Sequence, residues 1–104
     1  MNRSKEKGKK FDKGKPMVDL VDPKFIIEIA EILTHGACKY GLENWKNRLA
    51  VRRIYAALQR HLLAWHSGEL IDGETNKSHL AHAGCCLMFL MWYNRRGRCP
   101  HERQ

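Results

Sequence analysis

The apolar residues of this chain fall into three stretches with helical spacing, separated by polar segments. The first predicted helix follows Asp22, a good N-cap, begins at Pro23 and continues to about Tyr40, with Gly41 as its C-cap. Its repeating apolar positions are Phe25, Ile26, Ile29, Ile32 and Leu33.

The second predicted helix has one apolar face, formed by Val51, Ile54, Leu58, Leu62 and Trp65, and Gly68 ends it. Residues 68–78 are predicted to form a polar loop. A third helix begins at Ser78, and residues 80–93 are apolar apart from His82 and Gly84. At about 1.5 Å per residue this apolar run spans only about 21 Å, short of the roughly 30 Å core of a bilayer. We therefore predict a buried helix and no membrane span.

The fold class predicted from these elements is all-α, a small bundle of three main helices, because no β-type alternation occurs in the core segments. A helix that is apolar all round needs neighbours on every side. We therefore expect the chain to form a homo-oligomer, a dimer or higher, with the third helix at or near the interface.

The length of 104 residues allows one small domain. The net charge of +8 is concentrated at the two ends, since residues 1–16 hold seven basic and two acidic residues. We divide the chain into a flexible basic arm (1–16), a helical domain (17–97) and a basic tail (98–104). The basic ends favour solubility first, and the alternatives are phosphate capture and loose contact with nucleic acid, which is the unlikely partner.

The four cysteines (Cys38, Cys85, Cys86 and Cys99) contain no C-x-x-C pair, so neither a disulfide framework nor a zinc knuckle is indicated. No apolar segment follows the basic amino terminus, which argues against a secretory signal. We expect a cytoplasmic protein with reduced thiols.

Two acidic pairs are candidates for metal binding. Glu28 and Glu31 share a face of the first helix, and Glu69 and Asp72 follow the second helix. If the first two helices pack antiparallel, both pairs reach the same end of the bundle, where four carboxylates would bind Mg²⁺, with Mn²⁺ as the other candidate. The alternatives are a solvated helix flank and an acidic loop that keeps the domain soluble.

Histidines stand beside these acids. His79 and His82 open the third helix at i, i+3 spacing, and His61 lies in the second helix. Imidazoles near carboxylates serve as metal ligands, as proton shuttles or, when protonated, as hydrogen-bond donors to phosphate. A His/His/Asp cluster would suit a transition metal better than magnesium. An ordinary hydrogen-bonded core histidine is an equal alternative for His82.

Basic and aromatic side chains supply the other half of a phosphate site. Lys15, Lys39 and Arg60 could each reach a polyphosphate. Trp45 could stack on a base while Asn44 reads the edge of that base. The alternative for Trp45 is a structural plug at the end of the bundle.

Several spaced motifs, covering roughly residues 10–93, resemble the phage-encoded dATP/dGTP diphosphohydrolase amino-terminal domain family. They are Lys10-Phe11-Asp12-Lys13-Gly14-Lys15-Pro16 with Asp19-Leu20, the run from Ala30 to Gly41 with Asn44-Trp45, Arg60-His61-Leu62-Leu63-Ala64-Trp65 with Gly68-Glu69 and Asp72, and His79-Leu80-Ala81-His82-Ala83. That family is similar to the MazG-type all-α nucleoside triphosphate pyrophosphohydrolases, which the resemblance implies are helical, oligomeric and Mg²⁺-dependent.

The resemblance implies a (d)NTP pyrophosphohydrolase of the dGTP/dATP class that releases the monophosphate and pyrophosphate. The metal ligands would be Glu28, Glu31, Glu69 and Asp72. Glu31, Glu69 and Asp72 would act in catalysis with His79 as a proton shuttle. Nucleotide contacts would come from Lys15, Lys39, Asn44, Trp45, Arg60 and His61. The alternative is a phage protein that sequesters a nucleotide without turnover and counters host nucleotide signalling.

Overall fold

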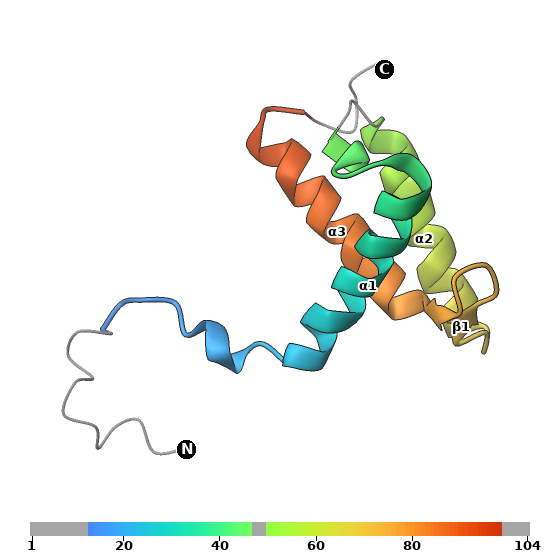
Figure 1. Cartoon of the computed structure of the whole chain (residues 1–104), viewed down its shortest axis with the longest axis horizontal. Helices are drawn as coiled ribbons and strands as arrows, with labels where there is room; N and C mark the ends of the chain where they lie inside the picture. Colours follow the sequence, from blue (N-terminus) through green and yellow to red (C-terminus); the bar gives the residue numbers. More distant parts are fainter. Residues whose placement is uncertain (1–12, 47–49, 99–104) are drawn as a thin grey trace.

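The computed structural model describes residues 13–46 and 50–98. Three helices make up most of this part, confirming the predicted all-α class (Figure 1). In chain order the elements are the 3-10 turn η3 (Val18–Leu20), helix α1 (Pro23–Tyr40), the 3-10 turn η4 (Asn44–Lys46), helix α2 (Val51–His66), strands β1 (Ile71–Asp72) and β2 (Lys77–Ser78), and helix α3 (His79–Arg95).

The helix ends follow from capping chemistry. The Asp22 side chain accepts a hydrogen bond from the backbone N–H of Lys24 at 3.1 Å, and Pro23 opens α1. Gly41 ends α1 with φ at 99°, a value that disfavours residues with a side chain. Ser78 caps α3 by accepting from the N–H of Leu80 at 3.0 Å. These local signals explain why the predicted start and end of α1 are confirmed and why α3 begins at His79, one residue after the predicted start at Ser78.

The segment predicted as a polar loop folds into a short antiparallel hairpin, so that prediction is corrected. Ile71 pairs with Ser78, and Asp72 pairs with Lys77. Two-residue strands are too short for their alternation to be recognised in a sequence. The turn is closed by Asn76 at φ 61°, a conformation that asparagine tolerates. The hairpin places Asp72 beside the start of α3.

Helix α3 is the centre of the domain because it packs against both other helices. Within the described residues α1 packs mainly on α3, so the condition of antiparallel packing of α1 along α2, under which both acidic pairs would reach one end of the bundle, is not met. Where α1 crosses α3, a Cβ on Gly84 would lie 2.9 Å from Cζ of Phe25, so glycine permits the close approach. The core between α2 and α3 contains Val51, Ile54, Leu58, Ala83, Cys86 and Tyr93.

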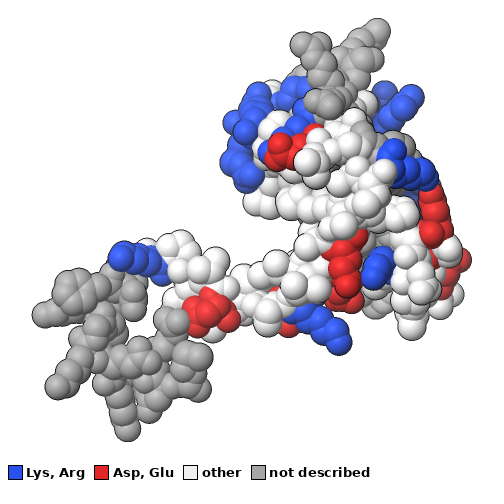
Figure 2. Space-filling view, in the orientation of Figure 1, with Lys and Arg blue, Asp and Glu red and all other residues white. Residues whose placement is uncertain are grey.

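Residues 13–22, before α1, extend away from the helical body (Figure 1). Most of the predicted flexible arm and basic tail, including Cys99, lies outside the described residues. Figure 2 shows Lys and Arg gathered where α3 ends, whereas acidic side chains are spread over the visible face, from the segment before α1 to the side of the hairpin. Within residues 13–46 and 50–98, no helix combines the length and hydropathy needed to cross a bilayer.

Candidate functional site

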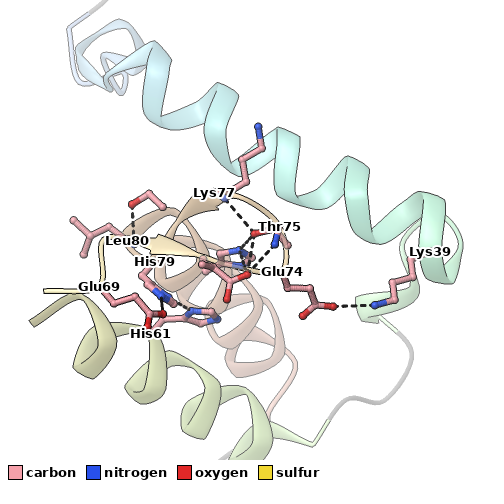
Figure 3. Close-up of polar contacts among 11 residues, drawn as sticks. Lys39, His61, Glu69, Glu74, Thr75, Lys77, His79 and Leu80 are labelled. Carbon is pink, nitrogen blue, oxygen red and sulfur yellow. Dashed lines mark hydrogen bonds and ion pairs between the residues drawn. The ribbon is translucent and has the colours of Figure 1, made fainter. Parts of the chain in front are cut away.

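Histidine and carboxylate side chains from three elements meet beside the hairpin (Figure 3). Helix α2 contributes one imidazole, α3 contributes two, and the segment between the helices contributes both carboxylates and a threonine. The cluster, which we call the histidine cluster, consists of His61, Glu69, Asp72, Thr75, His79 and His82.

His79 is the buried centre of the histidine cluster, with only 4% of its surface exposed. Its Nε2 lies 2.6 Å from Oε2 of Glu69, and its Nδ1 lies 2.9 Å from Nδ1 of His61. Because an ionised carboxylate only accepts hydrogen bonds, the Nε2–H of His79 donates to Glu69. Nδ1 of His79 then faces His61.

Thr75 holds the second carboxylate in place. Its backbone N–H and its hydroxyl donate to Oδ2 of Asp72 at 3.1 and 3.0 Å. The same hydroxyl lies 2.6 Å from Nε2 of His82, which is 3.8 Å from Oδ2 of Asp72. The His82 ring stacks on His61 at 4.6 Å between centroids. These contacts join all three histidines and both acids into one network.

Burial sets the charge state of this network. Desolvation, reinforced by the neighbouring His82 and His79, lowers the pKa of His61 below its ordinary value. Burial also lowers the pKa of His82, although Asp72 opposes the effect. Burial alone would raise the pKa of Asp72, but hydrogen bonds from Thr75 lower it. His61 and His82 are therefore neutral and Asp72 ionised near pH 7, the forms that bind metal ions.

A cavity of about 850 Å³ adjoins the histidine cluster. It lies among α1, η4, the hairpin turn and α3, and His82 and Thr75 belong to both the cavity wall and the cluster. Its size is within the range of small-molecule sites. The remaining wall is mainly apolar and includes Ile32, Leu33, Leu42, Trp45, Met88 and Phe89, with Lys39, Glu43, Asn44 and Glu74 as polar members.

The predicted nucleotide contacts divide into two groups. Lys39, Asn44 and Trp45 line the cavity together, with Lys39 paired to Glu74 at 3.0 Å across it. His61 belongs to the histidine cluster. Arg60 is exposed on α2 and Lys15 lies in the extended segment before η3, and neither lines the cavity. Trp45 also stacks on Phe89, with 4.7 Å between the ring centroids.

The four predicted carboxylates do not form one shell within the described residues. Glu69 and Asp72 lie among the imidazoles, whereas Glu31 forms an ion pair with Lys77, the strand partner of Asp72, at 3.1 Å. Glu28 lies one helical turn earlier on α1. Mg²⁺ prefers an octahedral shell of oxygen. The donors that converge here are mixed nitrogen and oxygen, so they do not fit a magnesium site.

The sequence did not indicate several residues of this region as site residues. Thr75 and Lys77 gave no signal, because their roles depend on the hairpin that was not predicted. Glu74 and His35, which also line the cavity, were not among the predicted site residues. His82 was left open between ligand and core residue, and its place in both the cluster and the cavity favours a functional role.

Comparison with known proteins identifies the same family as the sequence motifs. The family described as "dATP/dGTP diphosphohydrolase, N-terminal" matches residues 5–103. A curated protein of Salmonella phage PMBT28, named dATP/dGTP diphosphohydrolase, is 42% identical over 85 residues, which is 82% of this chain. The aligned region is 29% of that relative, so the chain spans less than a third of its length. No solved structure matches. The chain belongs to the dATP/dGTP diphosphohydrolase amino-terminal family.

Proposed function

We propose that this domain binds a purine deoxynucleoside triphosphate in the cavity and takes part in its hydrolysis to the monophosphate and pyrophosphate. The observation that carries this proposal is the continuity between cavity and histidine cluster at His82 and Thr75. A ligand in the cavity would lie directly beside ionisable groups. The name of the phage relative supports the substrate class. The site of reaction would be the cytoplasm of a phage-infected bacterium.

The apolar part of the cavity suits the base. Trp45 and Phe89 already stack, and a purine could extend that stack while the Asn44 amide contacts its edge. The polar part suits the phosphates, because Lys39 lies in the wall and Lys77 lies on the neighbouring strand. Both lysines are now paired with glutamates at exposed positions, where such pairs are weak and easily exchanged.

The chain's own residues offer a route for the proton. Water attacks the α phosphorus, the bond between that phosphorus and the bridging oxygen to the β phosphate breaks, and the proton of the water is transferred to a base. Neutral His82 beside ionised Asp72 is suited to accept it, since the carboxylate stabilises the imidazolium that forms. His79 would hold Glu69 rather than shuttle the proton.

A homo-oligomer is part of the proposal. Large apolar side chains are exposed along η3 and the first turns of α1, a segment that extends away from the body (Figure 1). Exposed apolar patches of this kind mark interaction sites. A second copy covering the segment would also bring another Lys15 and another α1 to the assembly. The exposed residues are Met17, Val18, Leu20, Val21, Phe25, Ile26 and Ile27.

The test of nucleotide binding uses two lysines of the same helix. Lys39→Ala should weaken dGTP and dATP binding, measured by calorimetry, by about tenfold, the effect expected from losing one charged phosphate contact. Lys24→Ala is the matched control, because Lys24 is an exposed lysine of α1 outside the cavity wall. Equal affinities of the two variants would contradict the cavity as the nucleotide site.

Turnover is measured separately by incubating the full chain with a panel of nucleotides and Mg²⁺ or Mn²⁺ and resolving the products by chromatography. We expect monophosphate and pyrophosphate from dGTP or dATP, with the rate reduced at least a hundredfold in folded Asp72→Asn. Glu31→Gln tests a second predicted catalytic carboxylate in the same assay. Bound nucleotide recovered intact would instead support the sequestering function, and wild-type turnover by both variants would refute the catalytic assignment.

A further inference from the structure

We infer that His61, His79 and Asp72 form a binding site for one first-row transition-metal dication of the Mn²⁺, Co²⁺ or Zn²⁺ class. This inference deepens the proposed function, and its catalytic meaning rests on that function. The site itself rests on the positions of these three side chains. One ligand atom of each residue lies within 4.8 Å of the other two.

The two imidazoles are arranged as neighbouring ligands. Their Nδ1 atoms are 2.9 Å apart. Two ligands at about 2.1 Å from one metal ion are separated by about 3.0 Å at right angles and by about 3.4 Å in a tetrahedral site. A proton on one of the two Nδ1 atoms makes this contact a hydrogen bond. A metal ion in place of that proton would be bound by both rings together.

The surroundings orient these ligands in the way that metal sites require. Nε2 of His79 donates to Glu69, which fixes the ring and leaves Nδ1 as the donor to a metal. Thr75 fixes Asp72 through two hydrogen bonds to Oδ2. His79 is 4% exposed, and a buried imidazole that is held by a carboxylate at one nitrogen is typical of a metal-binding histidine.

The donor types select the class of ion. Imidazole nitrogen is a better ligand for cobalt and zinc than for manganese, and Mg²⁺ demands an octahedral shell of oxygen and keeps several of its waters. Only one carboxylate belongs to the three-residue set, and Glu31 is held by Lys77. The chain should therefore bind a transition metal much more tightly than magnesium.

The position of the site gives it access to the cavity. The His82 ring stacks on His61 at 4.6 Å, lies near Asp72 and forms part of the cavity wall. An ion held by the other three residues would therefore lie close to the polar end of the cavity. His82 would remain available to substrate or water at that boundary.

The inference is tested by metal binding to the full chain after removal of bound ions with a chelator. Titration with Mn²⁺ and Co²⁺, followed by calorimetry and by the visible absorption of Co²⁺, should give one ion per chain. Affinity for Mg²⁺ in the same assay should be at least a hundredfold lower. The folded state should also gain thermal stability with Co²⁺, because an ion that binds only the native chain raises its melting temperature.

Substitutions of two proposed ligands locate the ion, because His61→Gln and Asp72→Asn should each lower Co²⁺ affinity at least tenfold. A third substitution, Glu69→Gln, should lower the affinity to a smaller extent by releasing His79. His66→Gln is the matched control, since His66 is an exposed histidine on the same helix and lies outside the cluster. Circular dichroism checks that each variant is folded. The variants avoid replacing His79, whose burial makes loss of folding a competing explanation.

The outcomes separate the two proposals. Co²⁺ binding that is unchanged in both His61→Gln and Asp72→Asn, or Mg²⁺ binding as tight as that of Mn²⁺, overturns the metal site. If metal binding fails while nucleotide still binds at the cavity, the cluster is a polar network and the proposed function stands. If the metal binds as expected but no nucleotide binds, the metal site stands and the proposed function fails.

Discussion

Burial rather than residue type sets the chemistry of individual side chains in this domain. Cys85 and Cys86 are adjacent in α3, and both are buried, with 3% and 8% of their surfaces exposed. Desolvation raises the pKa of the Cys85 thiol to about 12 and that of Cys86 to about 11. Cys38 is exposed on α1. The same functional group therefore exists in two environments.

These environments predict different reactivities toward an alkylating reagent. Only the thiolate reacts, and both raised pKa and burial keep the α3 thiols protonated and shielded. At pH 8, Cys38 should be alkylated at least a hundredfold faster than Cys85 and Cys86. Mass spectrometry of tryptic peptides checks this, because Cys38 and the α3 pair fall in separate peptides. In denaturant the rates should become similar, and equal rates in the native state would contradict the packing of α3.

The contacts of a single residue also explain why the sequence left the role of His82 open between a ligand and a core residue. Its helical position showed an apolar environment, which suits a core histidine. Its partners Thr75 and Asp72 come from a hairpin seven to ten residues earlier, and only that hairpin turns them toward the ring. A spacing rule within one helix contains no information about such a contact.

At the scale of elements, glycine decides how the helices cross. Gly84 lies in α3 where α1 passes over it, and an added Cβ would be 2.9 Å from Cζ of Phe25 and 3.2 Å from Cδ1 of Ile29. Gly36 lies in α1, and an added Cβ there would meet nothing within 4 Å. Both glycines are in helices, so their intrinsic helix propensities are comparable.

The two glycines therefore predict opposite effects of the same substitution. Gly36→Ala should raise the free energy of unfolding by up to about 1 kcal/mol, the gain in helix propensity. Gly84→Ala gains the same propensity but forces Phe25 and Ile29 to move, at a typical overpacking cost of about 1 to 3 kcal/mol. We expect a net loss of about 1 kcal/mol in urea unfolding. A stabilised Gly84→Ala variant would contradict the tight crossing.

At the scale of the whole molecule, too much apolar surface is uncovered for a typical single chain. Seven large apolar residues are exposed between Met17 and Ile27, and α3 exposes three more, Leu80, Leu87 and Met91. The latter set repeats at intervals of seven and four residues, which places it on one side of α3. A small monomer rarely exposes contiguous apolar patches of this kind.

This surface predicts self-association through the first segment. The chain of 12.1 kDa should have at least twice that mass by light scattering. Replacing both Val18 and Ile27 by Glu should shift the protein toward the monomer, because two carboxylates would be buried in an apolar contact. Lys24→Glu is the control, since it adds a carboxylate to the same segment without removing apolar area. A monomeric wild type, or an unchanged mass in the double variant, would refute this interface.

The sequence by itself determined the helices, because capping residues and apolar spacing are local: Asp22, Gly41 and Ser78 act within a few residues of themselves. It also determined the family, since its motifs are linear. The tertiary structure decided which acids share a site. Contacts such as those between Glu31 and Lys77 and between His61 and His79 join residues 46 and 18 positions apart. Their geometry depends on how α1 crosses α3 and on a hairpin too short to be recognised from its own residues.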